Sequence, residues 1–398
     1  MKKPLLMIAA IQLAVYTGFG MIIPILPKII KSIGAPPVHL GLLLSVYSIV
    51  SFITAPIWGS YSDRVGRRPV IIWGLLGFSI SFFLFAISGG QLWLMYLSRI
   101  LGGLSAGALS ACAMAYVADI TGEEERAKSM GIVGMMIGIG FILGPAIGGL
   151  FNFWGPYVPF YAAAVLTLIM MFVAAGTLKE SLQNLGETHN IHGKPSRLKA
   201  FTGSTKYLYV LSFSVAFALA GLESTFQFFE MEKIGATVFE IGIMFAVVGV
   251  VEAIMQGGVI RLFTKQGGET KGIAIGLVAS SAGFFLILLS ENIGTAMLYL
   301  AIFSAGNALI RPCVLSLLTK KTSVGQGMTT GLNSSMGSLG RIVGPILGTS
   351  VFAFNIHLPF LIGGFLSLAE ILLLVQFLRL DHRKKTNGNL INKGQAQG

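Results

Sequence analysis

Twelve long apolar runs constrain the fold of this chain more than any other feature of its sequence. Each run is about as long as the ~20 residues that a helix needs to cross the hydrocarbon core of a bilayer. They fall near residues 4–27, 40–59, 70–89, 92–117, 129–152, 157–177, 207–229, 238–260, 272–290, 293–318, 326–353 and 358–379. The sequence therefore predicts an all-α membrane protein with twelve transmembrane helices.

Composition argues against the alternative, a large soluble protein with a long buried core. The chain is 54% hydrophobic and 11% charged, with a mean hydropathy of +0.79. Soluble helices of this length need polar faces, which these runs lack. The first run is too long for a cleavable signal peptide and meets Pro24 and Pro27 where a cleavage site would lie. We therefore expect it to be the first span.

Positive charge is distributed unevenly among the connections between the runs. Of the 28 Lys and Arg residues, 22 lie in the two chain ends and in every second connection, and 3 lie in the other connections. This bias is typical of cytoplasmic segments, so we expect both termini in the cytoplasm. The net charge of +12 then reflects topology, and it indicates membrane lipids rather than nucleic acid as a partner.

One glycine and proline pattern occurs twice, with an offset of 200 residues. The two segments are GFILGPAIGGL from Gly140, in the fifth run, and GRIVGPILGTS from Gly340, in the eleventh. An even number of runs precedes the second group of six, so the two groups point in the same direction, as in a parallel internal repeat. The sequence predicts a first half (1–177), a cytoplasmic linker (178–206), a second half (207–379) and a cytoplasmic tail (380–398).

Three motifs in the expected order resemble those of the major facilitator superfamily. The connection after the second run reads Gly59-Ser-Tyr-Ser-Asp63-Arg64-Val-Gly66-Arg67-Arg68, the fourth run carries Arg99, Gly103 and Ala106, and the fifth carries Gly140, Gly144, Pro145, Gly148 and Gly149. The third motif is similar to one in the drug:proton antiporters of that superfamily. Further segments resemble the NorA and Bmr type of multidrug efflux pump, at Gly221-Leu-Glu223, Ile310-Arg311-Pro312 and Gly331-Leu-Asn333-Ser334.

This resemblance covers nearly the whole chain and implies a function. It implies a transporter of the bacterial cell membrane that exports hydrophobic, often cationic, drugs in exchange for protons by alternating access. The sequence departs from the resemblance at one place, because Asn307 and Ala308 stand where relatives place an acidic residue before the Arg-Pro of helix 10. A dedicated exporter of one metabolite is the alternative within transport, and a membrane enzyme or a channel is the alternative outside it.

The glycines of the repeated pattern predict close helix packing. Residues 140, 144 and 148 share one face of a helix, so another backbone can approach it, and Pro145 removes a backbone donor and bends the helix. Gly340, Gly344, Pro345 and Gly348 repeat this pattern in the eleventh run. The resemblance implies that helices 5 and 11 lie at the seam between the halves, where the halves move. Ordinary close packing without motion is the alternative.

The connection from Asp63 to Arg68 is short and charged, and the resemblance implies that it acts as a conformational latch. Asp63 would then meet the amino-terminal end of helix 11, and Arg67 would meet Asp119 at the end of helix 4. The alternative is an anchor that only holds the cytoplasmic end in place. The corresponding connection of the second half, residues 261–271, lacks an aspartate, so we expect the latch in the first half only.

Charged residues inside the predicted spans are the strongest indication of a functional site, because each costs ~2.5–3.5 kcal/mol on insertion scales. There are six, at Arg99, Glu223, Glu252, Arg311, Arg341 and Glu370. Glu223 shares a helix face with small and polar residues, and desolvation would let it exchange a proton near neutral pH, while its ionised form would attract a cation. The alternative is a carboxylate that is permanently paired with an Arg.

The other five charges receive weaker predictions. Glu252 lies near the middle of the eighth run and is the second candidate for proton or substrate binding. Arg99 and Arg311 fall on helices that line the cavity in the superfamily. Either one can set the pKa of a nearby carboxylate or hold its helix against a neighbour. Glu370 is expected to pair with Arg341 or to stay neutral.

Aromatic and polar residues of several runs are candidates for the cavity lining, because adaptable apolar surfaces suit a pocket with many substrates. The candidates are Tyr16, Phe19, Met114, Phe217, Phe226, Gln227 and Asn307, with core or lipid-facing packing as the alternative for each. Cys112 and Cys313 lack metal-ligand spacing and are expected to remain thiols. The sequence has no P-loop, nucleophile elbow or HExxH, so we expect no enzyme, cofactor or metal, and we expect an ion gradient rather than ATP as the energy source. We also expect a monomer.

Overall fold

The computed structural model describes residues 3–182, 203–264, 267–321 and 326–395, and these residues form helices and no strand. Twelve helical stretches are long and apolar enough to cross a bilayer, which confirms the twelve predicted spans. The elements are α1 (Lys3–Ile22), α2 (Leu26–Ser32), α3 (Val38–Val65), α4 (Arg67–Ala86), α5 (Leu92–Ile120), α6 (Glu123–Phe151), η1 (Asn152–Trp154), α7 (Val158–Thr177), α9 (Thr205–Lys233), α10 (Val238–Ile254), η2 (Met255–Val259), α11 (Ile260–Thr264), α12 (Glu269–Ile287), α13 (Ile293–Lys321), α14 (Gln326–Phe354) and α15 (Leu358–Gln395).

Three details differ from the sequence predictions. The first span is broken by a turn at residues 23–25, where Pro24 interrupts the helix, and it continues as α2 with Pro27 in its first turn. The charged connection from Asp63 to Arg68 is almost entirely helical, since only Gly66, with φ 101°, lies between α3 and α4. The expected tail from residue 380 begins as a continuation of α15. Most of the expected linker, residues 183–202, lies outside the described part of the chain.

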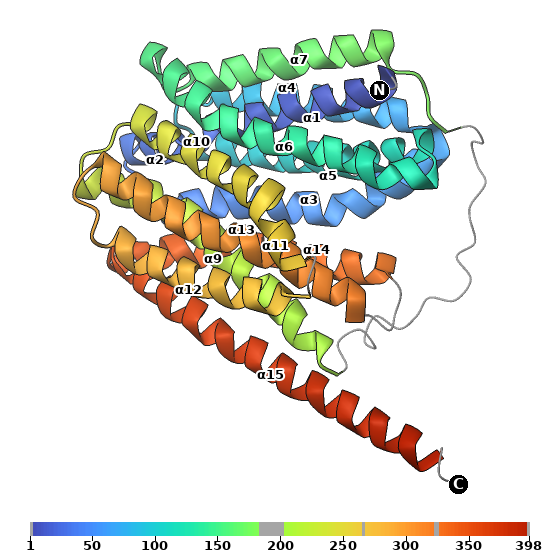
Figure 1. The fold of residues 1–398 in the computed structure, drawn as a ribbon. Helices are drawn as coiled ribbons and strands as arrows, with labels where there is room; N and C mark the ends of the chain where they lie inside the picture. Colours follow the sequence, from blue (N-terminus) through green and yellow to red (C-terminus); the bar gives the residue numbers. More distant parts are fainter. Residues whose placement is uncertain (1–2, 183–202, 265–266, 322–325, 396–398) are drawn as a thin grey trace.

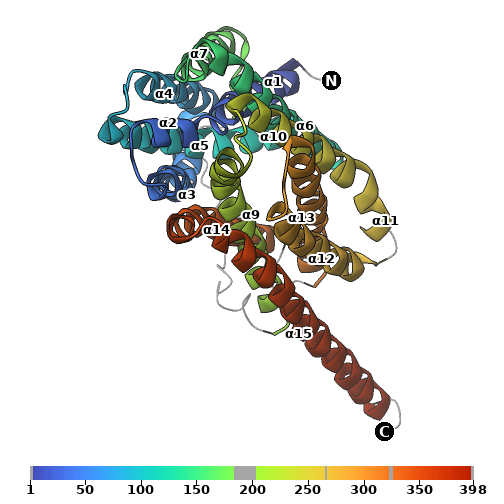
Figure 2. The same cartoon turned by 90° about the vertical axis from the view of Figure 1, so that its left-hand side faces the viewer.

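Each half is built from six spans that pack in the same pattern. In the first half α1 packs on α6 and α7, while α4 packs on α5 and α7. In the second half α9 packs on α14 and α15, while α12 packs on α13 and α15. Figures 1 and 2 show the two halves side by side, with the first in blue to green and the second in yellow-green to red. Contacts between the halves join α6 to α10 and α3 to α14.

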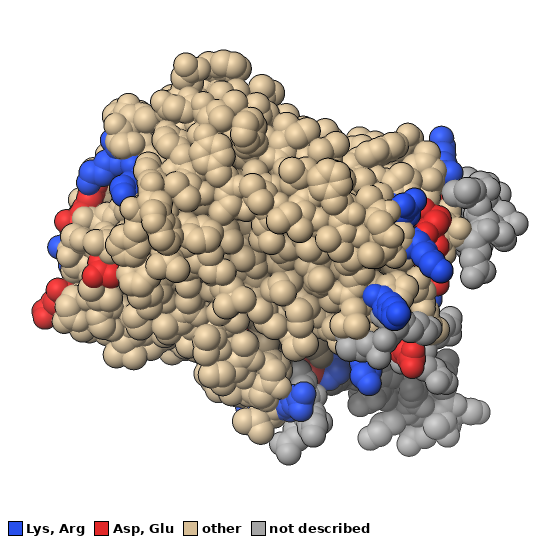
Figure 3. Space-filling view, turned by 90° about the horizontal axis from the view of Figure 1, so that it is seen from above, with Lys and Arg blue, Asp and Glu red and all other residues tan. Residues whose placement is uncertain are grey.

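Charged side chains gather at the two ends of the helix bundle. On the face that Figure 3 shows, Lys, Arg, Asp and Glu lie at opposite ends, and a broad band without charge lies between them. Such a band fits the hydrocarbon core of a membrane. We call the end at which residues 178–182 leave α7 the linker end, and the opposite end the far end (Figure 1).

Candidate functional site

Two carboxylates and two guanidinium groups lie together in the middle of the second half. Glu223 is on α9, Glu252 on α10, Arg311 on α13 and Arg341 on α14, and these four side chains interact electrostatically. Glu223, Arg311 and Arg341 are exposed and Glu252 is half-buried, although all four lie within membrane spans. Charges at this depth need partners or water. Because the four face one another, we infer that their exposed surface borders a central space that water reaches. We call them the central charge group.

Glu223 is far from the linker end and is not held in a salt bridge. It lies roughly 27 Å along α9 from Thr205, the first residue of that helix. Among the described residues, the ion pairs involve neither Glu223 nor Glu252. Ser304 Oγ donates to Glu252 Oε1 at 3.4 Å. In this structure the carboxylate of Glu223 therefore interacts with Arg311 and Arg341 without forming a salt bridge to either.

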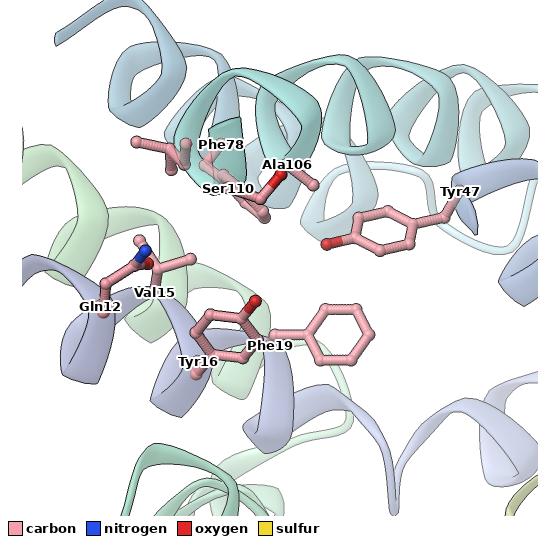
Figure 4. A pocket seen from close by; sticks show the side chains of 9 residues that line it. Gln12, Val15, Tyr16, Phe19, Tyr47, Phe78, Ala106 and Ser110 are labelled. Atoms are coloured by element: carbon pink, nitrogen blue, oxygen red, sulfur yellow. The ribbon is translucent and has the colours of Figure 1, made fainter. Parts of the chain in front are cut away.

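Aromatic side chains of the first half face the central charge group. Tyr16 on α1 and Tyr47 on α3 both interact electrostatically with Arg341 across the boundary. The Phe19 ring lies 5.1 Å from the Tyr47 ring, between their centroids. Figure 4 shows Tyr16 and Phe19 on one side of a small pocket, with Tyr47 and Ser110 on the other. The pocket is lined by Gln12, Val15, Tyr16, Phe19, Tyr47, Phe78, Ala106, Leu109 and Ser110.

The structure places some of the predicted cavity residues at the pocket and buries others. Tyr16 and Phe19 line the pocket, Phe217 is half-buried and stacks on Phe213, and Met114 packs half-buried against the core. Three predictions of cavity lining are wrong for this structure, because the side chains of Phe226, Gln227 and Asn307 are at most 2% exposed.

The structure gives a physical reason for the first of these errors and adds residues that were missed. Phe226 turns toward α10, where its ring packs 6.1 Å from that of Phe245. Tyr47, Gln12 and Ser110 carried no sequence signal beyond their helix positions, because which face of a span meets the boundary depends on packing. The Oε1 atom of Gln12 is buried and has no hydrogen-bond partner among the described residues.

Arg99 lies away from the central carboxylates. It is 1% exposed within the first half, its Nη2 donates to Ser98 Oγ at 3.3 Å, and its guanidinium lies 5.0 Å from the centroid of the Phe85 ring. Tyr47 is the group that interacts electrostatically with it. In this structure Arg99 therefore holds α5 against α4, and it reaches the pocket only through Tyr47.

Glu370 and Arg341 do not pair, contrary to one of the two expectations. Arg341 belongs to the central charge group, whereas Glu370 on α15 is 2% exposed, interacts with Ser214 on α9, and has an Oε1 atom without a hydrogen-bond partner among the described residues. The two side chains leave their helices toward different neighbours. A buried charge without a paired cation is costly, and the other expectation, that Glu370 stays neutral, stays a prediction.

The repeated glycines pack inside each half rather than across the boundary. A Cβ on Gly144 would lie 2.7 Å from Gly20 Cα on α1, and one on Gly344 would lie 2.5 Å from the Phe217 carbonyl oxygen on α9. Gly140, Gly148, Gly340 and Gly348 make the same kind of approach to α1 or α9. The expectation that these six glycines form the seam is therefore wrong in this structure, although α6 and α14 do lie at the boundary.

Other faces of α6 and α14 form the seam. Gly242 on α10 lies against the carbonyl of Pro145, and Gly149 lies against Phe239 of α10, where a Cβ would be 3.0 Å from its Cα. The other interface between the halves, α3 with α14, is built in the same way, because Gly41 on α3 lies against the carbonyl of Pro345 on α14. Pro145, Gly149 and Pro345 were in the predicted seam set, and each follows a repeated glycine by one position, an offset that turns it to another face of its helix.

The seam is closed at the far end. Ser45 Oγ on α3 donates a hydrogen bond of 2.6 Å to the Ile342 carbonyl on α14, and Gly249 on α10 packs against Ile142 on α6. Toward the linker end, a Cβ added at residues 131, 134 and 138 of α6, 257 and 258 of η2, or 331 and 337 of α14 would meet nothing within 4 Å. Figure 1 shows α6 and α11 diverging in that direction. The halves thus separate toward the linker end.

The charged residues around Asp63 form a network within the first half. Arg67 Nη2 pairs with Asp63 Oδ1 at 2.5 Å, and its Nε pairs with Asp119 Oδ2 at 3.3 Å. The Arg67–Asp119 contact is the one that the resemblance implied. Asp63, however, pairs with Arg67 on its own connection and is 60% exposed, rather than meeting the first turn of α14. The separated linker ends of the halves explain this difference.

The remaining latch residues surround this network. The Gly59 carbonyl accepts hydrogen bonds from Ser62 Oγ at 2.7 Å and from Arg67 Nη1 at 3.4 Å. Arg68 Nη2 donates to the Ala175 carbonyl of α7 at 2.5 Å, whereas Arg64 is exposed.

Glu180 is a member of this network that the sequence analysis missed. Its Oε1 accepts from the Arg67 backbone N–H at 2.8 Å, and its Oε2 accepts from that of Arg68 at 3.1 Å. These are the first N–H groups of α4, which have no partner inside the helix. The carboxylate after α7 therefore caps α4, and Gly66 leaves room for it. Only the tertiary fold brings residue 180 to this helix end.

The second half contains an equivalent network with the charges exchanged. Glu269, the first residue of α12, pairs with Lys320 near the end of α13, and Lys321 pairs with Asp381 on α15 at 2.8 Å. In the first half the corresponding first residue of α4 is the cation Arg67 and its partner on α5 is the anion Asp119. The second half therefore forms a charge network without an aspartate in this connection, because the polarity is reversed, and the expectation of a latch in the first half only stays a prediction.

The family follows from a comparison of the whole chain. Residues 8–329 and 268–396 match the model of the Major Facilitator Superfamily. The chain belongs to the major facilitator superfamily. It is 34% identical to multidrug resistance protein 2 of Bacillus subtilis over 88% of this chain and 89% of the relative. It is 28% identical to the quinolone resistance protein NorA of Staphylococcus aureus over 93% of this chain and 95% of the relative.

Solved structures support the major facilitator fold. The nucleoside transporter NupG superposes with a TM-score of 0.78 at 15% identity, over 95% of this chain and 99% of that protein. At this identity the likeness bears on the fold alone. Together with the relatives, it places this major facilitator protein among membrane transporters related to drug efflux proteins of the NorA and Bmr type.

Proposed function

We propose that this transporter exports hydrophobic, often cationic, drugs in exchange for protons by alternating access. The observation that carries the proposal is the central charge group, in which two carboxylates and two guanidinium groups are accessible in the middle of the membrane spans. Such charges are costly in a span and indicate a pathway for ions or substrate. The relatives are named for resistance to several drugs or to quinolones, which supports this substrate class.

The orientation is part of the same proposal. The linker end carries most of the Lys and Arg residues, which supports a cytoplasmic position for that end and for both termini in a bacterial cell membrane. The structure is then the state that receives substrate from the cytoplasm, since the seam is closed at the far end. The working unit of this proposal is a monomer.

In the proposed cycle, Glu223 alternates between two states. Its ionised carboxylate attracts a cationic drug, whose apolar part packs on Tyr16, Phe19 and Tyr47 of the first half. After the far end opens, a proton binds Glu223, which removes the negative charge and releases the cation. Arg311 and Arg341 limit the total charge in the space when Glu223 and Glu252 are both ionised.

The test uses purified protein in proteoliposomes with an imposed pH gradient and a cationic dye. We expect the wild-type protein to concentrate the dye and Glu223→Gln to lose this activity, because the carboxamide cannot ionise. Glu232→Gln is the matched control, since Glu232 lies on the same helix but is exposed near its far end. Concentration of the dye by Glu223→Gln would show that the coupling site lies elsewhere, and transport of only one compound from a panel of unlike drugs would favour a dedicated exporter.

A further inference from the structure

Glu230 is a buried carboxyl that the central charge group does not use. It lies on α9 near the far end, three residues before Lys233, the last residue of that helix, and it is 0% exposed. The apolar run of this span was predicted to end at residue 229, so the sequence placed Glu230 in a connection. The helix continues past it, and the side chain turns into the second half.

The hydrogen bonds around Glu230 can be counted. Ser290, in the connection between α12 and α13, has its Oγ 2.9 Å from Glu230 Oε1, 3.2 Å from Oε2 and 2.7 Å from the Ile287 carbonyl oxygen. A hydroxyl carries one hydrogen, so it can donate to only one of these acceptors. If Glu230 carries a proton, Ser290 donates to Ile287 and Glu230 donates to Ser290 Oγ. The contact between Ser290 and Ile287 and the contact between Ser290 and Glu230 are then both hydrogen bonds. If Glu230 is ionised, only one hydrogen is available for these two contacts.

No cation is paired with Glu230 among the described residues, so none compensates the charge that this carboxyl would carry without its proton. Lys233, the cation that interacts electrostatically with Glu230, donates from Nζ to the Leu288 carbonyl and lies 5.2 Å from the centroid of the Phe229 ring. His357, from the turn between α14 and α15, packs on that ring with a centroid distance of 5.7 Å, and Glu291 beside Ser290 is exposed. Among the described residues no ion pair includes Glu230. A buried carboxyl without a paired cation is stable in its neutral form.

Glu230 also lies on the helix face that carries Glu223. Residues 223, 227 and 230 are spaced i, i+4 and i+7, so they follow one another along α9 over roughly 10 Å. Gln227, between the carboxyls, is 2% exposed and donates from Nε2 to the Glu223 carbonyl oxygen at 3.3 Å. Its Oε1 is buried without a partner among the described residues, so it is free to accept a hydrogen bond. These three polar residues form a file along α9 from Glu223 toward the far end, which we call the polar file.

We propose that Glu230 is a second proton-binding site of this transporter, at the far end of the polar file that begins at Glu223. In the state described here, the proton is held between Glu230 and Ser290. When the far end opens, this proton exchanges with water on that side, so that the carboxylic acid loses a proton to water and the carboxylate regains one from it. The transport cycle then involves two protonatable carboxyls on α9, a statement that rests on the proposed function.

Proton binding is tested on the full-length protein without any transport. Infrared spectra at neutral pH report the carbonyl band of each protonated carboxylic acid. We expect Glu230→Gln, which keeps the shape and a hydrogen-bond donor, to lose one such band of the wild-type protein. Glu291→Gln is the matched control, because it removes an exposed carboxylate beside Ser290, and it is expected to keep every band. A spectrum of Glu230→Gln that retains all wild-type carboxylic acid bands would overturn the proposal.

The role in transport is tested by counting protons. In proteoliposomes we expect Glu230→Gln to move about one proton fewer per dye molecule than the wild type and Glu291→Gln. A purely structural carboxyl would leave the count unchanged, and equal counts would overturn the role in the cycle. If the wild-type protein moves no protons at all, the proposed function fails, and the infrared comparison still decides whether Glu230 binds a proton.

Discussion

Gly242 on α10 packs against the carbonyl oxygen of Pro145 on α6, so closely that a Cβ on the glycine would lie 2.5 Å from that oxygen. Gly41 on α3 has the same relationship to Pro345 on α14. Each contact joins one half of the transporter to the other, and an offset of about 200 residues relates the two. The two contacts belong to the closed seam at the far end, together with the Ser45–Ile342 hydrogen bond and the contact of Gly249 with Ile142.

Gly242→Ala and Gly41→Ala should favour states with the far end open. The added methyl group overpacks the seam, which costs ~1–3 kcal/mol in the closed state and nothing where the halves have separated. Spin labels on cysteines at Lys31 and Glu291, which are exposed at the far end in different halves, report the opening as a longer distance.

The control for this measurement is Gly131→Ala, since a Cβ there meets nothing within 4 Å. It should leave the distance between the two labels unchanged. If the seam variants give the same distance distribution as the control, the two glycines do not govern closure of the far end.

Gly144→Ala should destabilise the protein rather than change its conformation. The new Cβ would lie 2.7 Å from Gly20 Cα and from the Thr17 carbonyl oxygen, within the same half, so the cost of ~1–3 kcal/mol applies to every state that keeps α1 on α6. Thermal unfolding in detergent measures it, with Gly134→Ala, which faces open space, as the control. An unchanged midpoint with altered label distances would contradict this assignment.

Glu180→Ala should weaken the linker end of the first half. The carboxylate caps α4 through the backbone N–H groups of Arg67 and Arg68, and loss of a helix cap costs ~0.5–2 kcal/mol. Glu180→Gln keeps an acceptor oxygen and should lose less stability. Unfolding midpoints of the two variants measure the difference, and equal stability of wild type and Glu180→Ala would exclude the capping role.

The Glu269–Lys320 pair should show energetic coupling. Glu269 has a side chain that is 2% exposed, whereas that of Lys320 is 51% exposed, so solvent screens part of the interaction. In a double-mutant cycle with Glu269→Gln and Lys320→Gln, we expect a coupling energy of ~0.5–1 kcal/mol, favouring the intact pair. Additive losses of stability in the double variant would mean that the exchanged charges do not hold α12 to α13.

The sequence by itself determined the architecture of the membrane part. A span needs about 20 apolar residues whatever it packs against, so the twelve runs were readable one by one, and the ends agree with the helices to within a few residues at most positions. The offset of 200 residues between the two Gly-Pro patterns likewise predicted two similar halves. Glu223 was found because a charge inside an apolar run is visible without any structure.

Only the tertiary structure decided which helix faces meet. The glycine pattern of α6 predicted a close approach correctly, but its partner proved to be α1 of the same half, and the seam uses Pro145 and Gly149, one position after a repeated glycine. The contact of Glu180 with the first turn of α4 and the ion pair between Lys320 and Glu269 join residues that are distant in sequence. No local pattern marks these residues as partners. The physical reason is that lipid selects the apolar character of a whole span, whereas the rotation of each helix is set by the side chains and backbones of its neighbours.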